Sequence, residues 1–196
     1  MLVSYYQAFK SLSGIVAGVF STIPILSKLL LPDSFSAYGF PPLGNAEGPA
    51  RIGAVIFALA TTYSVFFTAR ETDDSGCRRR IHAAIICALI FLILYIGLFT
   101  GFVRKIEIPS KETAVQISVG FERTEFAKAN FRGESDWEVL RERGTDEEQV
   151  WKLWTLRSIV ISRLSLYGAY CIVLLSLVAA FSWGVLSELE KKAVHT

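Results

Sequence analysis

IHAAIICALIFLILYIGLFTGFV, residues 81–103, is a run of 23 residues that contains no Asp, Glu, Lys or Arg. At about 1.5 Å per residue, a helix of this length spans the roughly 30 Å hydrocarbon core of a bilayer. Helices of soluble domains average nearer a dozen residues and keep a polar face. The stretch therefore predicts a membrane-spanning helix and an integral membrane protein.

Three further runs have the same character. Residues 11–31 carry Lys28 as their only charge, whereas residues 52–69 and residues 164–186 carry none. Over the whole chain 52% of residues are hydrophobic and only 19% are charged, against about a quarter in soluble domains. We therefore expect a mainly α four-transmembrane-helix bundle with helices at about 11–31, 52–69 and 81–103 in residues 1–103. The fourth helix and a C-terminal tail occupy residues 159–196. If the first run, which contains Pro24, lies in the interface, three spans remain.

Residues 104–158 are the part of the chain that can fold outside the bilayer. Ile106 and Ile108 alternate with polar residues, a turn follows at Pro109, and alternation resumes from Val115 to Phe121. Period two over both stretches predicts a β-hairpin with one buried face. A capping box, Ser135-Asp136-Trp137-Glu138, predicts a short helix that would help to cover this face. The sequence thus predicts a small polar α+β domain between the third and fourth helices.

The last helix is predicted to be long and continuous, because no proline follows residue 146. It would run from about 146 to about 191 and carry the domain directly on the fourth span. Tryptophan and arginine side chains are typical of membrane–water interfaces. The predicted interface anchors are Trp151, Trp154, Trp183, Arg157 and Arg163.

The distribution of basic residues is nearly balanced between the two sides, with seven Lys and Arg on each. Short loops orient membrane proteins most strongly, and the short second loop holds Arg70 and the run Arg78-Arg79-Arg80. This favours cytoplasmic termini and an outside polar domain. Residues 104–163 contain no cysteine, which favours a bacterial inner membrane or a domain that faces a reducing compartment. The layout resembles that of tetraspanins, but their cysteine signature is absent from this loop, so none of their functions is carried over.

Motifs for catalysis are absent from the sequence. It has no P-loop, no dinucleotide fingerprint and no nucleophile elbow, and its two histidines, His82 and His195, lie far apart. The carboxylates of residues 134–148 alternate with arginines, which is typical of a solvated, salt-bridged face and not of an acid–base pair. The four apolar runs contain no Asp or Glu, which disfavours ion-coupled transport. We expect no enzyme, no cofactor, no metal site and no nucleic-acid partner.

Three functions remain open. The first is an oligomeric membrane sensor or effector, whose polar domain binds an unidentified ligand or partner and whose helices pack through Gly14 and Gly18. The second is an oligomeric pore that permeabilises the membrane. The third is an accessory subunit of a larger membrane complex. The candidate pore-lining residues share a hydroxyl group: Ser21, Thr22, Thr61, Thr62 and Ser64.

Overall fold

The computed structural model describes residues 40–69, 74–106, 115–143 and 146–194. The predicted first span, residues 11–31, lies outside the described residues, together with Gly14, Gly18, Ser21 and Thr22.

Three long helices dominate the described part of the chain. They are α3 (Glu47–Ala69), which follows the 3-10 turn η1 (Gly44–Ala46), α4 (Asp74–Phe102) and α8 (Leu156–Val194). All three are long and apolar enough to cross a membrane. The predicted runs 52–69 and 81–103 are thus confirmed as helical nearly throughout, although both helices begin earlier and α4 ends at Phe102. This is the organisation of an integral membrane protein.

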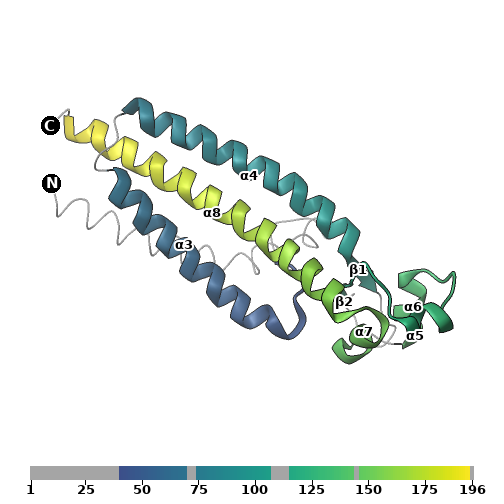
Figure 1. Cartoon of the computed structure of the whole chain (residues 1–196). Coiled ribbons are helices and arrows are strands. Elements are labelled where there is room, and N and C mark those ends of the chain that lie inside the picture. Colours follow the sequence, from purple (N-terminus) through teal and green to yellow (C-terminus); the bar gives the residue numbers. More distant parts are fainter. Residues whose placement is uncertain (1–39, 70–73, 107–114, 144–145, 195–196) are drawn as a thin grey trace.

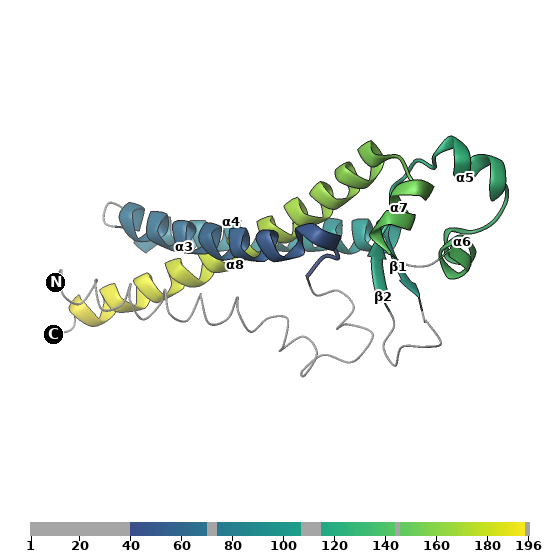
Figure 2. The same ribbon diagram turned by 90° about the horizontal axis from the view of Figure 1, so that it is seen from below.

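Helix α8 lies between α3 and α4 and packs against both (Figure 1). Viewed from below, it crosses the other two helices obliquely (Figure 2). Near the polar end, Tyr95 and Phe99 of α4 pack with Leu166 and Tyr170 of α8. At the other end, a second cluster joins all three helices: Ala58, Val65, Phe66, Cys77, Val178, Trp183 and Leu186.

The polar region, residues 103–155, starts with an antiparallel hairpin of β1 (Val103–Ile106) and β2 (Val115–Ser118). The two strands of the predicted hairpin are confirmed, but the first begins at Val103, directly after α4. The predicted strand residue Ile108 and the turn at Pro109 lie outside the described residues. Three short helices follow: α5 (Glu125–Asn130), α6 (Asp136–Arg143) and α7 (Glu147–Leu153). The capping box also forms, since the backbone N–H of Ser135 donates to Glu138 at 2.8 Å and that of Glu138 donates to the Ser135 hydroxyl at 3.3 Å.

The short helices cover the apolar face of the hairpin, as the sequence predicts. Ile106, Ile117 and Val119 from the hairpin side belong to the same buried cluster as Val139 and Leu140 of α6. Two isolated strands are marginally stable, so this cover is what lets the hairpin persist.

The prediction of one continuous helix from about 146 is wrong. The chain leaves helical geometry at Trp154, which has φ −119° and ψ 147°, and α8 begins only at Leu156. The cause is tertiary: Trp154 forms a β-bridge with Arg123, and the Thr155 N–H donates to the Glu122 carbonyl at 3.0 Å. These bonds replace those that a continuing helix would have made.

Candidate functional site

The break before α8 brings Glu147 of α7 against Arg163 of α8. Arg163 Nη1 donates to Glu147 Oε1 at 2.6 Å, and the two side chains are only 15% and 19% exposed. Sixteen residues of a continuous helix would separate them by about 24 Å. The contact therefore exists only because α7 turns back beside the first turns of α8, next to the hairpin (Figure 2).

The same pair reaches two other elements. The Asn45 backbone N–H, in the turn that leads into α3, donates to Glu147 Oε2 at 2.9 Å. On the other side, Arg163 Nε donates to the Ser118 hydroxyl of β2 at 2.9 Å. We call the four residues Asn45, Ser118, Glu147 and Arg163 the junction. It joins the polar region to two of the three long helices by charged hydrogen bonds, which are roughly twice as strong as neutral ones.

Gly44 is required for this arrangement. Its φ of +62° is a conformation that residues with a Cβ rarely adopt. A Cβ at this position would also lie 2.6 Å from Glu147 Oε2. The glycine therefore lets the turn before α3 come close enough for Asn45 to bond the carboxylate.

The junction keeps Glu147 ionised. Burial raises the pKa of this carboxyl, but the hydrogen bonds from Arg163 and Asn45 and the charge of Arg163 outweigh burial, so the net pKa is lowered. At neutral pH the side chain is a carboxylate that accepts two hydrogen bonds from elements far apart in the sequence.

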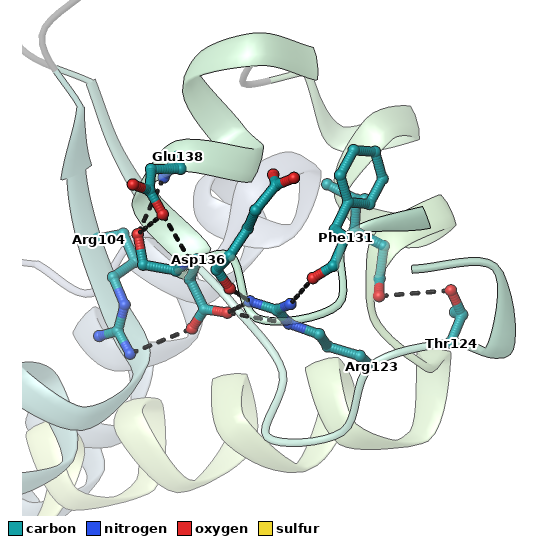
Figure 3. Close-up of polar contacts among 9 residues, drawn as sticks. Arg104, Arg123, Thr124, Phe131, Asp136 and Glu138 are labelled. Atoms are coloured by element: carbon teal, nitrogen blue, oxygen red, sulfur yellow. Dashed lines mark hydrogen bonds and ion pairs between the residues drawn. The ribbon is translucent and has the colours of Figure 1, made fainter. Parts of the chain in front are cut away.

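A second charged cluster holds the polar region together around Asp136 (Figure 3). Arg123 Nη2 donates to Asp136 Oδ1 at 2.8 Å, and Arg104 Nη2 donates to Oδ2 at 3.4 Å. Arg123 also donates to the carbonyls of Phe131 and Glu134, at 3.1 and 2.8 Å. The predicted salt bridges are present at Asp136 and Glu147, but the prediction that they are solvated is wrong for these two side chains, which are only 25% and 19% exposed.

A cluster of three aromatic side chains, Phe40, Tyr167 and Tyr170, lies beside the junction, where α3 meets α8. The Tyr167 hydroxyl donates to the Ala50 carbonyl at 2.8 Å. Phe40 packs edge-on against Tyr170, with ring centroids 5.2 Å apart, and Arg51 lies over the Phe40 ring. These contacts add apolar area and a cation–π interaction to the attachment of α3.

The five predicted interface anchors have different surroundings. Trp151 is 48% exposed and Arg157 is exposed, whereas Trp154 is 2% exposed and belongs to the core of the polar region. Trp183 is 5% exposed at the opposite end of α8. Arg163 points into the junction.

The described candidate pore-lining residues bond to their own helix. The hydroxyls of Thr61, Thr62 and Ser64 donate to the carbonyls four residues earlier at 2.9, 3.0 and 2.9 Å. Thr62 is also fully buried.

Within the described ranges, no three His, Cys, Asp or Glu side chains lie close enough together to hold a metal ion. His82 is exposed, with Nδ1 2.7 Å from the Arg78 carbonyl oxygen. The junction thus links the polar region to α3 and α8 through hydrogen bonds of Glu147 and Arg163. Sequence reasoning missed the junction, because Asn45 and Glu147 are 102 residues apart.

Comparison with protein-family models, with curated proteins and with solved structures gives no match to this chain.

Proposed function

We propose that this protein is a non-enzymatic membrane sensor or effector, in which the polar region binds a ligand or partner and passes the change to the long helices. The observation that carries the proposal is the Glu147 carboxylate, which accepts hydrogen bonds from Arg163 of α8 and from Asn45 before α3. A movement of α7 displaces both contacts together.

The short connections between the polar region and the long helices also support this coupling. Helix α4 passes into β1 at Val103 without a linker, and two residues separate α7 from α8. A ligand that binds two arrangements of the polar region with different affinity would shift the balance between two arrangements of the helices. Such a device needs no catalytic group.

The proposal includes oligomerisation, with both termini in the cytoplasm of a bacterium and the polar region outside the inner membrane. Oligomerisation is supported by the large apolar side chains that α3 and α4 leave exposed, among them Ile56, Phe67 and Ile93. Lipid and neighbouring copies can both cover such a surface.

Spin labels at the helix ends remote from the polar region test the coupling. Cysteines replace Phe67 of α3 and Phe181 of α8, both more than half exposed, in a chain that lacks Cys77, Cys87 and Cys171. Electron–electron double resonance then measures the distance distribution in reconstituted protein. We expect Glu147→Gln to shift or broaden this distribution, because it removes the charge that holds α3, α7 and α8 together.

Glu148→Gln is the matched control, since Glu148 is the next residue of α7 and bonds only Lys152 of the same helix among the described residues. It should leave the distribution as in the parent chain. Identical distributions in the two variants would refute coupling through the junction.

The two alternatives are separated by other measurements. A pore would give conductance in planar bilayers, and an accessory subunit would purify with a partner. The bonding of Thr61, Thr62 and Ser64 to their own helix gives the pore no specific support.

A further inference from the structure

Charged residues lie at both ends of the three long helices, but those at the polar end form ion pairs with acidic residues and those at the remote end do not among the described residues. At the polar end Arg51 pairs with Glu47, Arg104 with Asp136 and Arg163 with Glu147. At the remote end Arg78, Arg79 and Arg80 follow one another in α4, and all three are exposed. The ion pairs of the described residues involve none of these three.

The packing of α4 fixes the directions of these side chains. Cys77 and Ile81 pack into the cluster that joins the three helices. Successive residues of a helix point about 100° apart, so Arg79 points away from the bundle, with Arg78 and Arg80 on its two flanks. The run therefore presents positive charge around more than half of the helix.

Arg80 is held in place by α8. Its guanidinium carbon lies 4.7 Å from the ring centroid of Trp183, which is 5% exposed. Stacking uses the face of the guanidinium and leaves the N–H groups at its edge free to donate. A side chain ordered in this way loses little entropy when it binds a planar or tetrahedral oxyanion.

The depth of the run matches that of lipid phosphates. The apolar run of α4 begins at Ile81, immediately after Arg80, and Trp183 lies near the end of the apolar run of α8. The three arginines thus lie directly at the end of the apolar run, at the depth where a bilayer presents its phosphate groups.

We propose that Arg78, Arg79 and Arg80, with Trp183 as their support, bind the phosphate groups of anionic lipids in the leaflet remote from the polar region. Arginine recognises phosphate by paired N–H donors, and each basic residue near a membrane surface strengthens attraction to anionic lipid about fivefold. The proposal is independent of the sensor function and needs only the membrane setting of the helices.

Native mass spectrometry of the full chain in detergent micelles tests the proposal, with dioleoyl phosphatidylglycerol and dioleoyl phosphatidylcholine as probes. The parent chain should bind the anionic lipid at least tenfold more tightly than the zwitterionic one. The double variant R78Q/R79Q should lose most of this preference. The variant K128Q/R132Q, which removes two positive charges from the exposed surface of the polar region, should keep it.

Equal binding of the two lipids by the parent chain would overturn the proposal. So would an equal loss in the two variants, because bulk charge would then explain the binding. Circular dichroism reports whether R78Q/R79Q folds, and if it does not, the single variant R79Q, altered only at the outward position, is measured instead and should weaken binding about fivefold.

Discussion

Leu140 of α6 and Leu89 of α4 are the same side chain in opposite surroundings: the first is 0% exposed and the second is 55% exposed. Leu140 belongs to a cluster contributed by the hairpin and all three short helices. Leu89 lies on a helix whose partner, α8, covers only one side of it. In the polar region stability comes from enclosed side chains, whereas the long helices rely on the bilayer to cover most of their apolar surface.

The largest expected effect comes from shortening the buried leucine of the polar region. Leu140→Ala removes buried methyl groups and leaves a cavity, so we expect the polar region to lose about 2–5 kcal/mol of stability. Leu89→Ala should cost far less, because lipid fills the space. Urea unfolding of reconstituted protein, followed by tryptophan fluorescence, measures both.

Equal losses in the two variants would show that α4 is enclosed by protein where the structure leaves it exposed.

Much of this contrast is predictable from sequence. The long helices follow from uninterrupted apolar composition, and the hairpin follows from the alternation of Ile117 and Val119 with polar residues. The Ser135–Glu138 cap is also a local pattern, since both partners lie within one turn. Each of these features depends on residues close together in the chain.

The break at Trp154 and the junction are not predictable in this way. Nothing local ends the helix, because residues 146–194 contain no proline. The break depends on Glu122 and Arg123, some thirty residues earlier, and the Glu147 contact depends on Asn45. Such pairings are decided by three-dimensional packing. The charged residues that form these pairings cannot be distinguished from exposed charged residues by the sequence around them.

An intermediate effect is expected at the charged centre of the polar region. Asp136→Asn removes the carboxylate that Arg123 and Arg104 share, while the half-enclosed Arg123 keeps its charge. We expect a loss of about 1–3 kcal/mol in the same urea assay. Glu142→Gln, an exposed change on the same helix, is the control and should be within about 0.5 kcal/mol of the parent. A small effect of Asp136→Asn would place the stability of this region in its apolar cluster alone.

The smallest expected effect concerns the attachment of the two regions to each other, and it depends on pH. The pKa of Glu147 is lower in the folded chain than its ordinary value of 4.5. The unfolded chain therefore binds more protons at acidic pH, so stability rises with pH across this range. The contribution of Glu147 is fully present above about pH 4.5 and is lost as pH falls toward the folded pKa.

Removing the titrating group isolates this contribution. The carboxyl groups of Glu138, bonded by Ser135, and Glu148, bonded by Lys152, also have lowered pKa values, so the parent chain has several sources of acid sensitivity. The difference in unfolding free energy between the parent and Glu147→Gln should shrink as pH falls from 6 to below 4, whereas Glu148→Gln gives the background for an exposed neighbour. A difference that stays constant with pH would mean that Glu147 holds α3 and α8 through shape and neutral hydrogen bonds, and the two regions would then be joined by packing instead of charge.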